Sequence, residues 1–153
     1  RIVNTVSCTY AIGRIEPDFF EKGKNGRFFR IPVYGNTKLA LLLFTQELAK
    51  QIEDKNITIN ASDPGIVSTN MITMQAWFDP LTNILFRPFI KTPAQGAATA
   101  IHLALSDEAK DKNGCCYANC KKRNMTKRIQ HHTQQKQLWD DTETWLLQRG
   151  FRF

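Results

Sequence analysis

The sequence lacks any apolar run near the length of about 18 residues that marks a membrane-spanning helix, and no signal peptide is visible. Its four cysteines form no CxxC pair, and His131 and His132 are adjacent, which does not aim two imidazoles at one ion. We therefore expect no metal site. Reduced thiols in an intracellular protein are the simplest interpretation of this cysteine pattern.

A starting methionine and a glycine-rich phosphate-binding turn are also missing. The chain opens on Arg1, and Ile2-Val3-Asn4 already reads like the middle of a strand. Gly23 and Gly26 lie in a stretch with no strand before them, so they do not make a phosphate-binding turn at a helix N-terminus. We expect a fragment whose 153 residues make up a single partial domain.

Positive charge is in excess, with a formal net charge of +7. The densest basic run covers residues 120–128, has no interleaved aromatic residues and matches no nucleic-acid module. A solvated surface or a loose contact with anionic lipid explains the run more simply, so we expect no nucleic-acid partner. Binding of nucleic acid or anionic membrane through residues 121–128 stays as a minor alternative.

The pattern of apolar residues predicts alternating strands and helices. Residues 1–7 are β-branched and mostly apolar, which suits a strand buried in a parallel sheet. From residue 34 to about 52 apolar residues recur at three- and four-residue steps, with Gln46 and Glu47 on the other face, which predicts an amphipathic helix. Residues 57–65 predict a second strand that ends in a turn, so the order indicates a right-handed βαβ unit.

The remaining segments give weaker signals. Residues 13–32 are rich in glycine and proline and predict an irregular surface excursion. Residues 68–89 are apolar with mixed period, and either two short helices forming a lid or a buried core segment fits them. Residues 91–105 predict a helix with Thr92 as its N-cap, residues 114–120 a third short strand and residues 133–150 a terminal helix.

Tyr34 and Lys38 are four residues apart at the start of the predicted long helix, so both side chains can point to one place. An ammonium close to a phenol lowers the pKa of the phenol from about 10, as a tyrosine acid/base near neutral pH requires. By itself, however, this spacing more often means a surface lysine beside a partly buried tyrosine.

Two further features follow the two predicted strands and change that balance. Ser7 comes at the end of the first strand, where a hydroxyl can hydrogen-bond a substrate oxygen, although alone it would more often be a simple loop residue. The stretch Asp63-Pro64-Gly65 ends the second strand in a tight turn, with exposed backbone groups and the Thr69 hydroxyl after it. Such a turn can hold an amide-bearing ligand.

Taken together, "RIVNTVSC", "YGNTK" and "NASDPGIVSTNM" resemble the short-chain dehydrogenase/reductases, and their order and separations fit that family. The family has a serine after one strand, a Tyr-x-x-x-Lys helix, and Pro-Gly-x-Val-x-Thr after the next strand. The stretches "TKLALLLFTQELAKQ", "KTPAQGAATAIHLAL" and "GCCYANCKK" look like its retinol-dehydrogenase-like branch, so the resemblance covers nearly the whole chain. It implies an α/β fold, the C-terminal half of a Rossmann-like, doubly wound parallel sheet.

The resemblance also implies a role for each matching residue. Tyr34 would exchange a proton with the substrate oxygen, which Ser7 would hold. Lys38 would assist Tyr34 and bind the nicotinamide ribose, and Tyr34 would also contact the cofactor. The remaining cofactor contacts would come from the turn that follows the second strand, at Pro64, Gly65, Val67 and Thr69. A lipophilic substrate would then be sorted by residues 71–89.

The chain departs from the family pattern at a few positions. Val6 stands where the family has a first serine, and Gly35 and Asn36 occupy the first turn of the Tyr-bearing helix. Asp63 replaces the usual histidine or asparagine before the Pro-Gly pair and adds a negative charge near the cofactor. The glycine-rich half that binds the dinucleotide in the family is absent.

The function that the resemblance implies is an NAD(P)-dependent oxidoreductase that interconverts a lipophilic, retinol-like alcohol and its carbonyl. NADP is the cofactor favoured by the branch, with NAD as the alternative, and the fragment alone is expected to be inactive. A truncated, catalytically inactive homologue acting as an interaction module is the competing hypothesis. The resemblance implies an intracellular protein, cytoplasmic or associated with the endoplasmic reticulum, and leaves a homodimer and contact with a membrane surface open.

Overall fold

The computed structural model describes residues 1–16, 19–20, 30–67 and 90–152. In chain order its elements are β1 (Ile2–Thr5), the 3-10 helix η1 (Cys8–Ile12), α1 (Arg30–Gln51), β2 (Ile59–Asp63), α3 (Pro93–Leu105), the 3-10 helix η3 (Asp107–Ala109), β3 (Cys116–Ala118), β4 (Lys121–Lys122), α4 (Lys127–Gln130) and α5 (Gln135–Leu147). None of the described helices is long and apolar enough to cross a membrane.

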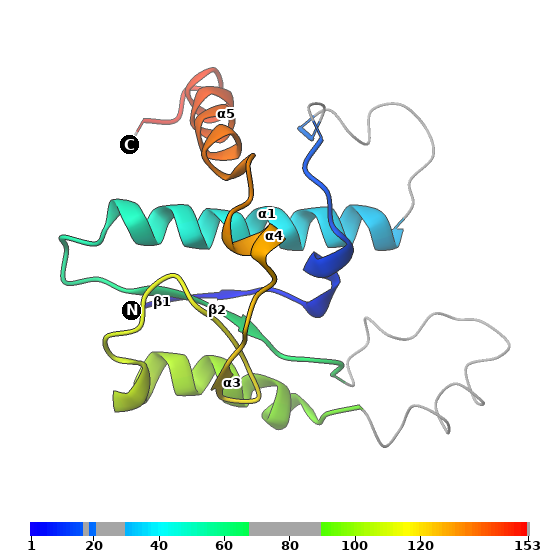
Figure 1. The fold of residues 1–153 in the computed structure, drawn as a ribbon, viewed down its shortest axis with the longest axis vertical. Helices are drawn as coiled ribbons and strands as arrows, with labels where there is room; N and C mark the ends of the chain where they lie inside the picture. Colours follow the sequence, from blue (N-terminus) through cyan, green and yellow to red (C-terminus); the bar gives the residue numbers. More distant parts are fainter. Residues whose placement is uncertain (17–18, 21–29, 68–89, 153) are drawn as a thin grey trace, which may run out of the picture.

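The strands form one sheet in the order β1-β2-β3-β4. The pairs β1–β2 and β2–β3 are parallel, whereas β4 returns antiparallel to β3. Figure 1 shows α1 on one face of this sheet and α3 on the other. Helices on both faces of a mostly parallel sheet confirm the predicted α/β class and agree with part of a Rossmann-like doubly wound sheet.

The main core lies between α1 and the sheet. Three leucines of α1, Leu39, Leu42 and Leu43, have 0% exposed surface. They pack with a cluster made of Val6, which directly follows β1, and residues of η1, β2, β3, α4 and α5, namely Tyr10, Ala61, Cys116, Ile129 and Leu138. A second cluster includes Leu103 of α3 and Tyr117 of β3. Each face of the sheet is thus held by its own helix through buried apolar side chains.

Two features of α1 differ from the sequence prediction. The helix begins at Arg30 rather than Tyr34, with Pro32 in its first turn. Proline is tolerated there because the first N–H groups of a helix have no intrahelical partner. Glu47 is only 7% exposed, because α5 packs against α1 and Gln135 Nε2 donates a hydrogen bond to Glu47 Oε2 at 2.9 Å. The face expected to be polar is therefore partly covered.

Helix α3, strand β3 and helix α5 match their predictions closely, whereas η1, η3, β4 and α4 have no counterpart among the sequence predictions. Thr92 caps α3, because its Oγ1 accepts from Gln95 N at 3.2 Å while Gln95 Oε1 accepts from Thr92 N at 2.9 Å. This reciprocal pair is a capping box. The third strand and the terminal helix form as β3 and α5. The predicted surface excursion lies partly, and residues 68–89 wholly, outside the described residues.

The β3–β4 hairpin is closed by a two-residue loop, Asn119-Cys120, between the paired residues Ala118 and Lys121. Both loop residues have positive φ, 53° at Asn119 and 59° at Cys120. Positive φ at both central positions defines a type I′ turn, for which Asn-Gly is the favoured pair. Asparagine suits its position, whereas Cys120 carries a side chain in the left-handed region.

We expect Cys120→Gly to raise the free energy of unfolding by about 0.5 kcal/mol, because relief of the left-handed strain exceeds the added freedom of the unfolded chain. The hydrogen bond from Cys120 N to Thr99 Oγ1, at 3.2 Å, uses only the backbone N–H of Cys120 and would persist. Urea unfolding measures the change. Cys120→Ala is the control, since it removes the thiol but keeps Cβ, and an equal gain from alanine would contradict the strain argument.

Candidate active site

Tyr34 and Lys38 lie on one side of α1, close to the carboxyl end of β1. The Lys38 ammonium nitrogen is 5.5 Å from the centroid of the Tyr34 ring. It also donates a hydrogen bond to the Thr5 carbonyl oxygen at 2.9 Å, which ties the helix to the last residue of β1. Tyr34 is 38% exposed, and its hydroxyl has no hydrogen-bond partner among the described residues. The arrangement leaves a phenol open to a ligand beside a fixed cation.

Ser7 follows β1 by two residues and serves as the N-cap of η1. Its Oγ accepts a hydrogen bond from Thr9 N at 3.4 Å, and the side chain is half-buried. An oxygen that accepts one hydrogen bond still has its own proton to donate. Since Lys38 binds Thr5, both Ser7 and the Tyr34–Lys38 pair are anchored at the same end of β1.

A close backbone contact seats η1 on the start of α1. A Cβ added at Gly13 would lie 2.4 Å from the Gly35 carbonyl oxygen, and one added at Gly35 would lie 3.0 Å from the Thr9 carbonyl oxygen. Neither position has room for a side chain without movement of the backbone. Gly35, which departs from the family pattern, is therefore explained by the close approach of the segment that carries Ser7.

Asn36 strengthens the same contact. Its Oδ1 accepts a hydrogen bond from Arg14 N at 2.8 Å, just beyond the end of η1. From the other side, Arg128 Nη2 donates to the Gly13 carbonyl oxygen at 2.8 Å. The two unusual residues after Tyr34 thus both hold the Ser7 segment against the Tyr34 helix.

The turn after β2 has the sharp geometry that its sequence predicts. Gly65 has a φ of +76°, a conformation that residues with a side chain rarely adopt. Gly65 N donates to Asp63 Oδ1 at 3.0 Å, and Lys91 N donates to the Ile66 carbonyl oxygen at 2.8 Å. The bond from Lys91 N does not use the Val67 N–H, which has no hydrogen-bond partner among the described residues. Thr69 lies outside the described residues.

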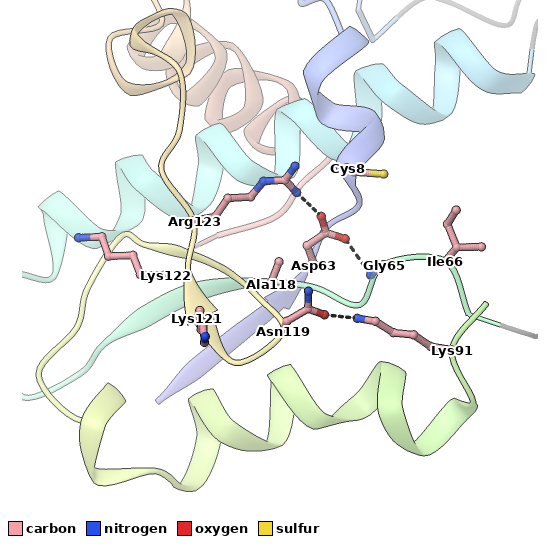
Figure 2. A pocket seen from close by; sticks show the side chains of 10 residues that line it. All are labelled: Cys8, Asp63, Gly65, Ile66, Lys91, Ala118, Asn119, Lys121, Lys122 and Arg123. Atoms are coloured by element: carbon pink, nitrogen blue, oxygen red, sulfur yellow. Dashed lines mark hydrogen bonds and ion pairs between the residues drawn. The ribbon is translucent and has the colours of Figure 1, made fainter. Parts of the chain in front are cut away.

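Asp63 is 2% exposed and forms an ion pair that sequence reasoning did not identify. Its Oδ2 accepts a hydrogen bond of 2.7 Å from Nη1 of Arg123, which lies 60 positions later in the chain (Figure 2). Arg123 belongs to the basic run that the sequence suggested was a solvated surface. A buried carboxylate requires a cation or several hydrogen-bond donors. The presence of Asp63 at the end of a buried strand is therefore the one sequence signal that such a partner exists.

Lys91 supports the turn from the opposite side. Lys91 Nζ donates to the Pro64 carbonyl oxygen at 2.8 Å. It also donates to Asn119 Oδ1 at 2.7 Å (Figure 2). Gly96 of α3 also leaves room for Val67, because a Cβ there would lie 2.5 Å from Val67 Cγ2. The turn is therefore fixed by the β3–β4 hairpin and by the start of α3.

The buried groups beside the turn are poor nucleophiles. Burial, with a smaller contribution from the Asp63 carboxylate, raises the pKa of the Cys116 thiol to about 12. Burial likewise raises the pKa of Tyr10, whose ring lies 5.8 Å from the Arg123 guanidinium carbon. A thiol that stays protonated near neutral pH is not a nucleophile, so Cys116 is a core residue.

The predicted site residues lie at the carboxyl-terminal end of the sheet. β1 and β2 are neighbouring parallel strands with Thr5 opposite Ser62, and Val6 N donates to the Ser62 carbonyl oxygen at 2.9 Å. Ser7, Lys38 and the Pro64-Gly65 turn therefore lie at adjacent carboxyl ends, where open α/β sheets bind ligands. The substrate-sorting segment proposed at residues 71–89 falls outside the described residues.

Comparison with known proteins finds both a matching family model and similar proteins that are longer than this chain. A family model described as "short chain dehydrogenase" matches residues 22–77. Human "Retinol dehydrogenase 14" is 36% identical over 148 residues, covering 94% of this chain and 43% of that protein. Mouse "Retinol dehydrogenase 12" is 34% identical over 140 residues, covering 92% of this chain and 43% of that protein. The "WW domain-containing oxidoreductase" of Drosophila melanogaster is 31% identical over 117 residues, 76% of this chain and 29% of that protein. The chain therefore spans less than half the length of these relatives.

Proposed function

Since the chain belongs to the short-chain dehydrogenase family, in its retinol-dehydrogenase-like branch, we propose that it is the catalytic portion of an NAD(P)-dependent oxidoreductase. The substrate class is a lipophilic alcohol and its carbonyl, by analogy with the retinol named for the relatives. The observation that carries the proposal is the meeting of Ser7, the Tyr34–Lys38 pair and the Pro64-Gly65 turn at adjacent strand ends.

In the proposed mechanism, Tyr34 exchanges a proton with the substrate oxygen. Its exposed hydroxyl is not tied to another described residue, so it is free to bond a substrate. The Lys38 ammonium at 5.5 Å from the ring stabilises negative charge that develops on the phenol oxygen during proton release. Ser7 donates its hydroxyl proton to the same substrate oxygen and holds the carbonyl or alkoxide in place.

The residues present also fit a nicotinamide cofactor. Lys38 has N–H groups beyond the one bound to Thr5, and these would meet the nicotinamide ribose. The Pro64-Gly65 turn, with Gly65 at positive φ, would bring the Val67 backbone to the carboxamide. Thr69 completes this predicted set. The bound nicotinamide would supply or accept the hydride. NADP in preference to NAD and an intracellular location stay predictions, and a homodimer stays open.

The test is Tyr34→Phe in a full-length enzyme that contains this chain. Loss of the proton donor is expected to lower kcat by about 100-fold or more, while the protein stays folded. Tyr117→Phe is the matched control, because it removes a phenol hydroxyl from β3 and leaves Tyr34 intact. Full turnover of Tyr34→Phe with a lipophilic alcohol would exclude the assigned proton transfer and favour an inactive homologue or another mechanism.

A further inference from the structure

The turn that follows β2 borders an open space. A cavity of about 460 Å³ lies between this turn and the β3–β4 hairpin (Figure 2). Side chains connect the two sides of the cavity. Asp63 pairs with Arg123, just after β4, and Lys91, just before α3, reaches both Pro64 in the turn and Asn119 in the hairpin. The position of the turn therefore depends on these side-chain contacts.

Lys91 contacts the turn through both its backbone and its side chain. Its backbone N–H donates to the Ile66 carbonyl oxygen at 2.8 Å, and it pairs with Val67 in an isolated parallel β-bridge. Its ammonium donates to the Pro64 carbonyl oxygen at 2.8 Å. Its side chain lies against Gly65, because a Cβ added at Gly65 would be 3.1 Å from Lys91 Nζ and 3.3 Å from Lys91 Cε. Lys91 thus touches four consecutive residues of the turn.

The peptide unit between Pro64 and Gly65 is held at both of its polar ends. Its carbonyl oxygen accepts from Lys91 Nζ, and its N–H donates to Asp63 Oδ1 at 3.0 Å. Hydrogen bonds to an ionised group are stronger than those between two neutral groups. Rotation of this peptide unit would break both bonds, so the two charged side chains keep Gly65 at its φ of +76°.

The peptide unit between Ile66 and Val67 sets the direction of the Val67 N–H. Its carbonyl oxygen accepts from Lys91 N. In a trans peptide the C=O and the N–H point in opposite directions, so the Val67 N–H points away from Lys91. The Val67 side chain packs against Gly96, where a Cβ would lie 2.5 Å from Val67 Cγ2. The Val67 N–H is therefore a donor of fixed direction, without a partner among the described residues.

We infer that Lys91 is a positioning residue for the nicotinamide ring, because its ammonium fixes the turn that presents the Val67 N–H. The inference rests on the proposed function, in which the Val67 backbone meets the carboxamide. Lys91 acts through the turn and does not need to touch the cofactor. Asn119 assists, because its Oδ1 accepts from the same ammonium at 2.7 Å and holds it at the Pro64 carbonyl.

The test is Lys91→Met in a full-length enzyme that contains this chain. Methionine keeps an unbranched apolar side chain beside Gly65 and leaves the backbone bond to Ile66 in place, while the ammonium is lost. A contact with the carboxamide exists before and after hydride transfer, so weakening it raises KM rather than lowering kcat. We expect the KM and the dissociation constant for NADP or NAD to rise about fivefold, while kcat changes by less than about twofold.

A purely structural role would give a different pattern, because partial unfolding lowers kcat through loss of active enzyme and leaves KM unchanged. ADP-ribose and 2′-phospho-ADP-ribose lack the nicotinamide, so they should bind equally well to the wild type and to Lys91→Met. Lys91→Arg keeps a cationic donor for the Pro64 carbonyl and should recover most of the affinity for the dinucleotide. Lys110→Met, at an exposed position away from the turn, is the matched control and should leave all of these values unchanged.

A second measurement needs no cofactor. Hydrogen exchange of residues 63–67 in the free enzyme, followed by mass spectrometry, should be about fivefold faster in Lys91→Met, because the peptide unit that carries the Gly65 N–H is held less firmly. Unchanged exchange, or normal affinity for the dinucleotide, would overturn the positioning role of Lys91 even if the Tyr34 mechanism holds. A wild-type enzyme that binds neither NADP nor NAD would instead overturn the proposed function, and the role of Lys91 with it.

Discussion

Arg123→Met is expected to lower the free energy of unfolding by about 3 kcal/mol, measured by urea denaturation. Asp63 is 2% exposed, and without Arg123 its carboxylate would keep one hydrogen bond among the described residues, from Gly65 N. An uncompensated buried charge costs far more than the lost attraction. The Arg123 side chain is 41% exposed, so water and ions can approach, and we place the loss at the lower end of the usual range.

Two further variants distinguish the ion pair from a general loss of charge. Lys122→Met removes a neighbouring cation whose ammonium group forms no hydrogen bond or ion pair with the described residues, and should change stability by less than about 0.5 kcal/mol. Adding Asp63→Asn to Arg123→Met should recover part of the loss, because an amide can still accept the Gly65 hydrogen bond without burying charge. No recovery in the double variant would mean that Arg123 acts through packing on Tyr10 rather than through Asp63.

Leu43→Ala is expected to have an effect of similar size, about 3 kcal/mol lost from the free energy of unfolding. Leu43 has 0% exposed surface in the cluster that joins α1 to the sheet. Its truncation removes buried methyl groups and leaves a cavity that Leu39 and Leu42 cannot fill without moving. We therefore expect the midpoint of thermal unfolding to fall. Although α1 carries Tyr34, the change in the geometry of the candidate site should be too small to resolve.

Leu105→Ala is the matched control for Leu43→Ala. It is the same substitution within a helix, and Leu105 at the end of α3 is 76% exposed. A loss below about 0.5 kcal/mol is expected there. Similar losses at both positions would show that α1 is not anchored through its buried leucines.

Much of the fold could be predicted from local sequence patterns. Thr92 and Pro93 mark the start of α3 because a capping side chain and a proline act within one helical turn. The strand–helix–strand order predicts parallel pairing because a right-handed crossover is the general rule. The start of α1 was placed late because a proline such as Pro32 fits both a loop and a first helical turn.

The site was only partly predictable, for a different physical reason. Tyr34, Lys38 and the Pro64-Gly65 turn carry their own local spacing, whereas Arg123 meets Asp63 across 60 positions of sequence. Glu47 was assigned to solvent because the contact with Gln135, 88 positions away, has no local signature. Such partners follow from packing of the whole sheet, and only the buried carboxylate of Asp63 hinted that one was needed.

The contact between Gly13 and Gly35 has a consequence for the proposed mechanism. Because the two backbones touch and Asn36 bonds Arg14 N, η1 and the first turns of α1 form one preorganised unit. In the proposed mechanism, Ser7 and Tyr34 would then approach a substrate oxygen without an entropic cost for bringing the two hydroxyls together. Gly35 and Asn36, which depart from the family pattern, would thus hold the Ser7 and Tyr34 hydroxyls rigidly in place. The residues that match the family pattern would carry out the chemistry.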